Sequence, residues 1–235
     1  MAMRKIIIIA ILLGLSPVEA GEVSLELGTG FSQFNYFQKP NINTNRVDLN
    51  YKKIISYRIK YTHDLKNNWF LSFLYAPLET NYQIKNKTPI IFNNSHYQAG
   101  KLDVFYKFNS YRVGFLKKIE RKKYSYWGGL VGKIRDARIE VSQGSINDSF
   151  SNIGFVPLLS FGGEYKFRDF SLYSHTDALA APQGSAYDTQ LEIRIYKNKQ
   201  SYSWGYRLLG GGVDNEKIKN FAQFQSMYFS WNIRF

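Results

Sequence analysis

Strict alternation of apolar and polar residues at the carboxyl end constrains the fold of this chain more than any other feature. Over residues 226–235 every second residue is apolar or aromatic, and nearly all the residues between them are polar. A β-strand produces this period of two because its successive side chains point to opposite faces. Four more segments repeat the pattern, at 55–62, 153–167, 190–195 and 201–208. The chain is therefore predicted to be all-β.

The first twenty residues are typical of a secretory signal peptide. Arg4 and Lys5 form a positive start, residues 6–15 are apolar, and residues 18–20 resemble a small-residue cleavage site. About ten apolar residues are too few for a membrane-spanning helix, which needs roughly twenty. We expect cleavage after Ala20, with the signal peptide at 1–20 and one domain at 21–235. Cleavage removes two basic residues and one acidic residue and leaves a net charge of +12.

A soluble β-sandwich also alternates, so the period alone does not choose between a sandwich and a membrane barrel. The export signal, the absence of cysteine and the long strands that end in aromatic residues favour the barrel. The spacers favour it too, because short turns on one side and long loops on the other are typical of a transmembrane β-barrel. The short spacers are 66–68, 120–123, 168–169 and 197–200, and the long ones are 38–53, 79–100, 142–151, 179–186 and 211–221.

The predicted fold is a transmembrane antiparallel up-and-down β-barrel of ten strands, with eight or twelve as alternatives. An even number places both termini on the periplasmic side. A turn at Asn109 and Ser110 would make the count odd, so we prefer a bulge there. Pro157 should also lie at a bulge, because it cannot donate to the ladder. The strands are expected at roughly 23–37, 54–64, 69–78, 101–119, 124–141, 152–167, 170–177, 187–196, 201–210 and 222–235.

Parity assigns the side chains to the two sides of the barrel wall. Aromatic residues near the short turns should face lipid and form the girdle of the membrane interface, namely Trp69, Tyr126, Tyr165, Phe167, Tyr202 and Trp204. Inside, a ten-stranded lumen is narrow enough for side chains to fill. We expect a network of paired charges there, made by Glu26, Arg58, Lys60, Glu164, Glu192, Arg194, Arg207 and Arg234.

The closing strand resembles those of the small integral outer-membrane proteins of Gram-negative bacteria. An alternating last strand with a terminal aromatic residue looks like the signal that the barrel-assembly machinery recognises. The segments 133–140 and 154–159, and the segment 210–215 with 220–222, are similar to an uncharacterised group within the same class. The resemblance covers the whole mature chain and implies the architecture and an outer-membrane location, but no activity. The residues that match the assembly signal are Tyr228, Trp231, Ile233 and Phe235.

The net charge of +13 does not indicate a nucleic-acid partner, because such proteins concentrate Lys and Arg in clusters. Here the bases are spread among Tyr, Phe, Ile and Asn, and many lie at the short turns. A cation near an anionic membrane surface gains roughly 1 kcal/mol. We therefore expect outer-membrane lipids and lipopolysaccharide as partners. No cofactor is expected, because the chain has no cysteine and only three histidines.

His175 and Asp177 are the only candidates for catalysis. They lie two apart on one strand and share its inward face, which we expect to be near the extracellular end. Omptin proteases place a second acidic pair opposite such a pair, and lipid A deacylases use a His-x-Ser motif. This chain has no Asp-x-Asp pair. The run that matches the deacylase motif is His175-Thr176-Asp177, so Asp177 stands at the position of the serine. The sequence therefore offers no nucleophile beside His175 for hydrolysis of this kind.

The sequence thus predicts a monomeric outer-membrane barrel, exported through the inner membrane, with a non-enzymatic membrane, binding or structural role. A narrow porin-like channel for small solutes is the first alternative, and bases outnumber acids in the predicted lumen, which favours anionic solutes. A hydrolase with a rim site at His175 and Asp177 is the second. Residues 178–184 are expected to form an apolar loop that plugs or covers the mouth.

Overall fold

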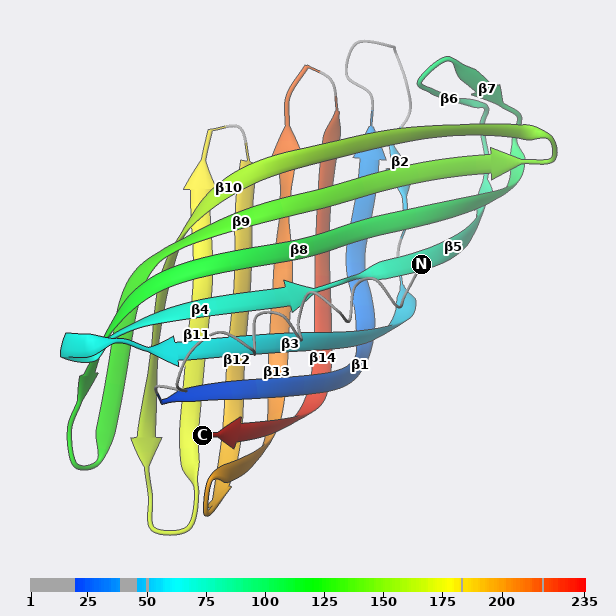
Figure 1. The fold of residues 1–235 in the computed structure, drawn as a ribbon. Helices are drawn as coiled ribbons and strands as arrows, with labels where there is room; N and C mark the ends of the chain where they lie inside the picture. The colour runs from blue at the N-terminus through cyan, green and yellow to red at the C-terminus, as the bar shows by residue number, and fades with distance from the viewer. Residues whose placement is uncertain (1–19, 39–45, 50, 183, 217) are drawn as a thin grey trace.

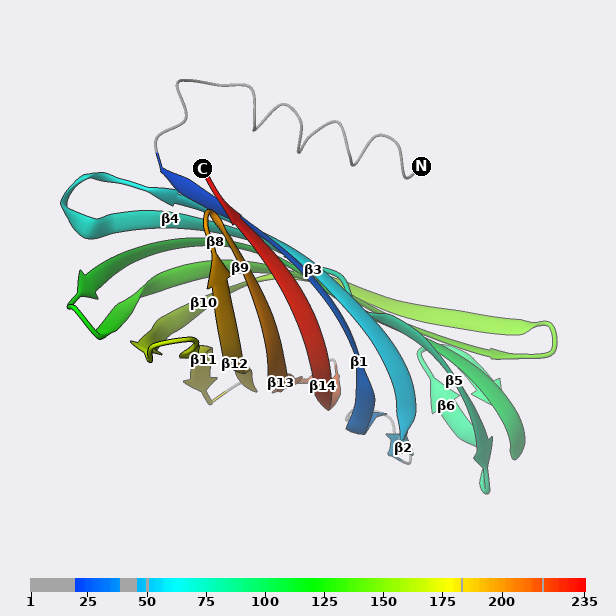
Figure 2. The same cartoon turned by 90° about the horizontal axis from the view of Figure 1, so that it is seen from below.

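The computed structural model describes residues 20–38, 46–49, 51–182, 184–216 and 218–235. All its strands except the separate β6–β7 hairpin form one antiparallel sheet, which closes on itself because β14 pairs with β1 along its whole length (Figure 2). The sheet has 12 segments, but β2 has only 2 residues and β4 and β5 continue one another. Ten strands therefore form the ring, and the predicted closed antiparallel barrel is confirmed.

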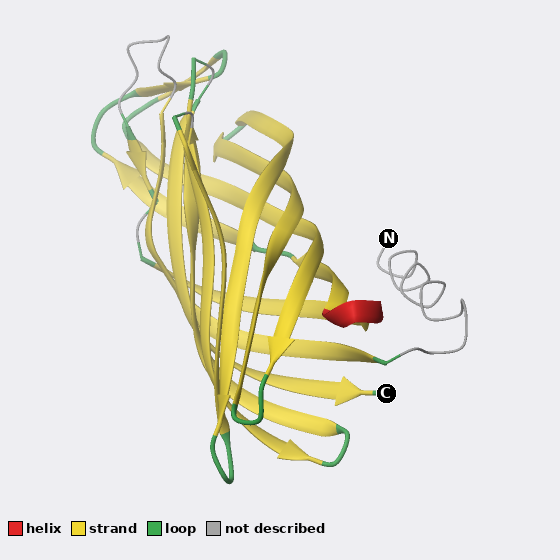
Figure 3. Ribbon diagram, turned by 90° about the vertical axis from the view of Figure 1, so that its left-hand side faces the viewer, coloured by secondary structure: helices red, strands yellow, loops and turns green. Residues whose placement is uncertain are grey.

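Strands make up nearly all of the described chain, with one short 3-10 turn, η1 (Lys66–Asn68), between β3 and β4 (Figure 3). No helix among the described residues is long and apolar enough to cross a membrane. The strands are β1 (Gly21–Gln38), β2 (Val47–Asp48), β3 (Lys52–Asp64), β4 (Trp69–Ala76), β5 (Glu79–Asn86), β6 (Ile90–Phe92), β7 (Ser95–Tyr97), β8 (Gly100–Glu120), β9 (Tyr124–Gln143), β10 (Ile146–Lys166), β11 (Ser171–Ala181), β12 (Gly184–Lys197), β13 (Gln200–Asp214) and β14 (Lys219–Arg234).

The alternation of the sequence matches the two faces of the wall. On β14, Met227 is 72% exposed, whereas Ser226 and Tyr228 on either side of it are buried in the interior. Apolar side chains are exposed in the same way around the ring, as on β1, β9, β10 and β12. An exposed apolar belt with a polar interior is the inverse of a soluble protein, and it is the pattern that lipid requires.

Three of the predicted long loops consist mostly of strand. Residues 142–151, 179–186 and 211–221 belong mostly to the ends of neighbouring strands, and 79–100 contains β5, β6 and β7. Residues 178–181 are likewise part of β11 and form no lid. These segments have the sequence of loops because beyond the membrane neither face of a strand needs to be apolar. We call the end of the barrel that carries these segments the outer end, and the opposite end the short-turn end.

Asn109 and Ser110 form neither a turn nor a bulge, because β8 pairs with β9 in one register from Asp103 to Glu120. The interruption lies on the neighbouring strand, where Pro77 and Leu78 separate β4 from β5. The backbone N–H of Leu78 donates to Oδ1 of Asn109 at 2.9 Å, and the N–H of Phe108 donates to the carbonyl of Leu78 at 2.7 Å. Asn109 thus replaces a ladder bond that the proline interrupts.

The predicted bulge at Pro157 is also wrong. β10 pairs with β9 without a shift from Ile146 to Tyr165, and Pro157 lies opposite Gly132. On its other side, β10 pairs with β11 only from Leu159 to Lys166. Pro157 therefore lies just beyond the last pair, on the open edge of the strand, where the missing N–H costs no ladder bond.

The outer end is closed by a hydrophobic core that lies inside the ring. β5 and the outer halves of β8, β9 and β10 lean across the ends of β13, β14 and β1 (Figure 1), and the β6–β7 hairpin contributes to the same core. The inner faces meet in a continuous apolar cluster, which we call the outer core. Its largest fully buried members are Phe37, Leu49, Phe92, Tyr97, Leu102, Val104, Tyr106 and Val141.

Candidate functional site

Below the outer core, seven charged side chains fill the lumen. Asp188 of β12 lies at their centre: its carboxylate is 2.7 Å from Arg112 of β8, 2.7 and 3.0 Å from Arg207 of β13, and 3.6 Å from Arg58 of β3. All seven are buried, so these charges interact across a medium less polarisable than water. We call this group the central charge cluster, and its members are Glu26, Arg58, Arg112, Lys133, Asp177, Asp188 and Arg207.

Hydrogen bonds tie the cluster to strands all around the ring. Glu26 of β1 lies 3.4 Å from Arg58 and 3.5 Å from Arg207, and it accepts a bond from Gln190 at 3.2 Å. Asp177 of β11 pairs with Arg112 at 2.7 Å. The cluster therefore connects strands far apart in the sequence and closes the lumen at mid-height.

The predicted lumen network divides into three groups. Glu26, Arg58 and Arg207 belong to the central charge cluster. Lys60, Glu164, Glu192 and Arg194 lie nearer the short-turn end, around a cavity described below. Arg234 is at the rim, mostly exposed and 3.9 Å from Asp64, so its assignment to a buried network is corrected. It lies at the last position of β14, where the lumen opens to water.

Four side chains of the interior are not among the residues predicted for the lumen: Arg112, Lys133, Asp188 and Gln190. Asp188 was placed at the start of its strand, but β12 begins at Gly184, so Asp188 lies well inside the ring. The other three lie at alternating positions within predicted strands, and extending the parity count to every strand would have found them. Their convergence on Asp188 depends on contacts across the lumen, which alternation does not report.

His175 lies in the short-turn half of β11, only four residues after the strand begins at Ser171, and not near the outer end as predicted. The indole N–H of Trp127 donates to Nδ1 of His175 at 3.0 Å, and Nε2 lies 3.1 Å from Oδ1 of Asp177. Both ring nitrogens are therefore engaged, and Asp177 is shared with Arg112. A general base needs a nitrogen that can accept a proton from a nucleophile. This histidine is arranged as a structural link.

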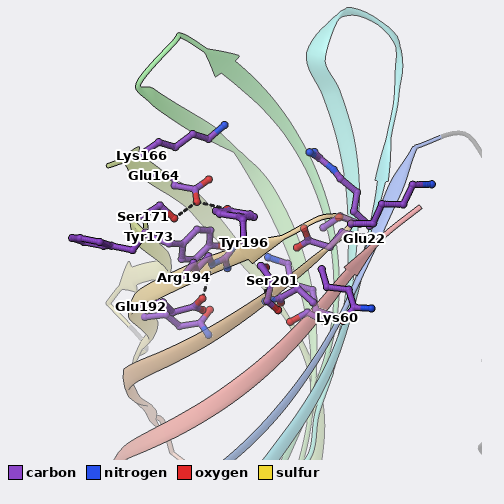
Figure 4. Close-up of a pocket in the computed structure, with 18 of the residues that line it drawn as sticks. Glu22, Lys60, Glu164, Lys166, Ser171, Tyr173, Glu192, Arg194, Tyr196 and Ser201 are labelled. Atoms are coloured by element: carbon purple, nitrogen blue, oxygen red, sulfur yellow. Dashed lines mark hydrogen bonds and ion pairs between the residues drawn. The ribbon is translucent and has the colours of Figure 1, made fainter. Parts of the chain in front are cut away.

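A cavity of about 440 Å³ opens at the short-turn end (Figure 4). We call it the vestibule. Its floor is formed by Arg58, Glu26 and Gln190 at the lower side of the central charge cluster. Phe70 and Trp127 contribute apolar surface to its side. The volume falls within the range of small-molecule sites, about 300–1,000 Å³.

One wall of the vestibule carries a stacked and ion-paired arginine (Figure 4). The guanidinium of Arg194 lies 3.5 Å from the centroid of the Tyr173 ring, and its Nε donates to Glu192 at 2.7 Å. Tyr228 from β14 donates to the same carboxylate at 2.8 Å. Nearer the mouth, Glu164 accepts hydrogen bonds from Ser171 and Tyr196. Most carboxylates of the wall are therefore already partnered.

The mouth of the vestibule carries a small ion-pair group. Glu120, at the end of β8, lies 3.4 Å from both Lys118 and Lys166. Partial burial raises the pKa of the Glu120 carboxyl, but the two lysines outweigh burial and hold the pKa below its ordinary value. Glu120 thus remains an anion at neutral pH and neutralises part of the cationic rim.

The structure places most of the predicted girdle on the outside of the short-turn end. Tyr126, Tyr165 and Trp204 are exposed on the outer face, while Trp69 and Tyr202 are half-buried against aromatic neighbours. Phe167 is exposed in the turn after β10 and lines the vestibule. Of the proposed assembly signal, Trp231 is outward, and Tyr228 points into the lumen. Phe235 stacks on Tyr61 at the closing seam. Among the described residues no three His, Cys, Asp or Glu side chains are grouped to hold a metal ion.

Comparison with known proteins identifies the fold. The outer membrane protease OmpT from Escherichia coli superposes with a TM-score of 0.58 at 10% identity, over 94% of this chain and 99% of that one. The chain has the fold of a Gram-negative outer-membrane β-barrel. This fold supports a location in the outer membrane. At such low identity, the likeness shows architecture alone.

Other solved barrels are also similar, at lower TM-scores. The translocator domain of the autotransporter NalP from Neisseria meningitidis gives 0.47 at 11% identity, covering 100% of this chain and 95% of that one. Ail from Yersinia pestis, an attachment invasion locus protein, gives 0.38 at 14% identity, covering 89% and 98%. No family model matches the chain, and no curated protein matches it.

Proposed function

We propose that this protein is a non-enzymatic, non-conducting outer-membrane barrel whose binding site opens toward the periplasm. The proposal rests on one observation: within the described residues, the central charge cluster fills the lumen at mid-height, the outer core fills the outer end, and the 440 Å³ vestibule lies toward the short turns. Short turns face the periplasm in outer-membrane barrels. A ligand would therefore reach the vestibule from the periplasm.

The two layers that fill the lumen oppose passage in different ways. The outer core presents apolar side chains to an ion, which would lose its hydration there. In the central charge cluster, most charged side chains are ion-paired with partners on other strands. Displacing one of them would leave its partner buried without a counter-charge. A narrow channel, the alternative role, would require both layers to move apart.

Planar-bilayer recording tests this proposal. The purified protein is expected to insert without ohmic current steps, with chloride, sulfate or bulky organic anions as the charge carrier. An open porin inserted in the same membrane serves as the control for insertion conditions and sensitivity. Reproducible steps that scale with the number of inserted molecules would overturn the non-conducting role in favour of the channel.

The hydrolase alternative predicts that His175 is required for cleavage. Because both ring nitrogens are engaged, we expect a His175→Ala variant to leave lipid A profiles and peptide cleavage by whole cells unchanged. The change should act on stability instead, since it leaves the buried indole N–H of Trp127 without its acceptor, at a cost of about 1–3 kcal/mol. Loss of a cleavage product in the variant, with the barrel still folded, would restore the enzyme.

The remaining expectations from the sequence belong to the same proposal. The signal peptide at 1–20 lies, apart from Ala20, outside the described residues. Lipids and lipopolysaccharide are the proposed partners of the outer surface. The exposed apolar belt supports this, and so does Lys117, which lies 5.5 Å from the ring of Trp69 at the short-turn edge of the belt. The barrel-assembly machinery is the proposed partner of β14, and the protein is proposed to act as a monomer.

A further inference from the structure

The central charge cluster above the vestibule has one cation without a carboxylate partner. The central charge cluster holds four cations and three carboxylates. The fourth cation, Lys133, is 2% exposed, lies 4.7 Å from the ring centroid of Phe108, and has no carboxylate within ion-pair distance in the described chain. An uncompensated charge in a protein interior is strongly unfavourable. Lys133 does not line the vestibule, so an anion bound there would compensate this charge only at a distance.

One group at the vestibule floor is available to hold an anion. Arg58 lines the cavity, but its side chain is 5% exposed and its guanidinium already lies 3.4 Å from Glu26 and 3.6 Å from Asp188. Lys60 lies two residues further along β3 on the same face and also lines the cavity. No described carboxylate is within ion-pair distance of its ammonium group. An ammonium group forms charge-assisted hydrogen bonds with the oxygens of a carboxylate.

The neighbouring surface of the vestibule suits the rest of such a ligand. Leu74 lies opposite Lys60 in the β3–β4 ladder. Phe70, Trp127 and Tyr173 continue this apolar surface, with the Trp127 and Tyr173 rings 5.1 Å apart. Flat apolar groups pack favourably against aromatic side chains. The vestibule thus places cations and an aromatic surface around one space.

Resting on the proposed function, we infer that the vestibule binds a small organic anion that enters from the periplasm, with its carboxylate at Lys60 and its apolar body against Phe70, Trp127 and Tyr173. Charges of both signs line the vestibule, with Glu22, Asp64, Glu120 and Asp169 among the lining residues. Lys166, Arg168 and Lys199 line the mouth, and only Lys166 among them is ion-paired in the described chain.

The chain contains no cysteine, so one introduced thiol reports on the vestibule alone. Ser24 lines the cavity and lies opposite Lys60 in the β1–β3 ladder. The Ser24→Cys protein, refolded in zwitterionic micelles, is treated with N-ethylmaleimide in the presence of 2-naphthoate or of its neutral analogue 2-naphthalenemethanol. We expect naphthoate to slow labelling saturably by about tenfold and the alcohol to have little effect, because only naphthoate gains a charge-assisted bond.

Two variants test the anchor in the Ser24→Cys background. Lys60→Gln should raise the half-protecting naphthoate concentration roughly tenfold, as expected for the loss of one charge-assisted hydrogen bond. Lys53→Gln is the matched control, because Lys53 lies on the same strand but on the outward face, and it should change nothing. Lys60→Arg should retain protection, and heat-modifiability on gels establishes that each variant is folded.

Every outcome bears on the inference. Equal protection by naphthoate and the alcohol, or unchanged protection in Lys60→Gln, would overturn the anionic ligand while leaving the one-ended barrel intact. A thiol at position 24 that never reacts would show that the vestibule is closed, and this too overturns it. Current steps in the bilayer experiment would instead remove the proposed function, so the two failures are distinguishable.

Discussion

Replacing Asp188 by asparagine is expected to lower the free energy of unfolding by about 3–5 kcal/mol, the range for removing one partner of a buried ion pair. Arg112 and Arg207 each lie 2.7 Å from its carboxylate, and Arg58 lies 3.6 Å away. Asparagine keeps the shape but removes the charge, so three guanidinium groups would face one another. The measurement is reversible urea unfolding of the barrel in lipid vesicles, followed by tryptophan fluorescence.

A double variant separates lost charge from lost shape. Asp188→Asn combined with Arg207→Met removes one of the repelling cations, and it should recover part of the stability lost in the single variant. Glu140→Gln is the surface control, since Glu140 pairs with Arg138 at 2.7 Å on the half-exposed outer end. Such pairs contribute about 0–1 kcal/mol. A single variant as stable as the wild type would show that the cluster is not held by Asp188.

The membrane part of the barrel could be predicted because lipid imposes one rule on each strand. Every residue that faces the bilayer must be apolar, so parity alone separates Met227 and Phe229 from Ser226 and Tyr228. The same rule fixed the number of strands once Asn109 and Ser110 were not treated as a turn. No comparable rule acts above the membrane, where β9 and β10 continue as strands through Gln143 and Ile146.

The site could be predicted only in part, for a different physical reason. Parity identifies which side chains point inward, and Glu26, Arg58 and Arg207 were found in this way. It does not report height along the barrel or contacts across it. Trp127 and His175 come from strands on either side of β10, and their hydrogen bond joins residues 48 positions apart in the sequence. The division into cluster and vestibule depends on such contacts.

Replacing Phe92 by alanine is expected to loosen the outer end without opening the barrel. Phe92 is fully buried in the outer core and meets Phe37 edge-on, with ring centroids 5.1 Å apart. Truncating a buried phenylalanine costs about 3–5 kcal/mol. Amide hydrogen exchange in β5–β7 and the outer half of β8 should therefore accelerate by roughly a hundredfold or more, since each 1.4 kcal/mol is a factor of ten.

Exchange in β11–β13 should stay slow in the Phe92→Ala variant, because the central charge cluster connects these strands independently of the outer core. For the same reason the variant should remain non-conducting in planar bilayers. Phe105→Ala is the matched control: Phe105 lies on β8 between the inward Val104 and Tyr106, so its ring is on the outward face, and its loss should have a much smaller effect. Current steps in Phe92→Ala alone would mean that the outer core is the only barrier, and that the charges below it leave a continuous aqueous path.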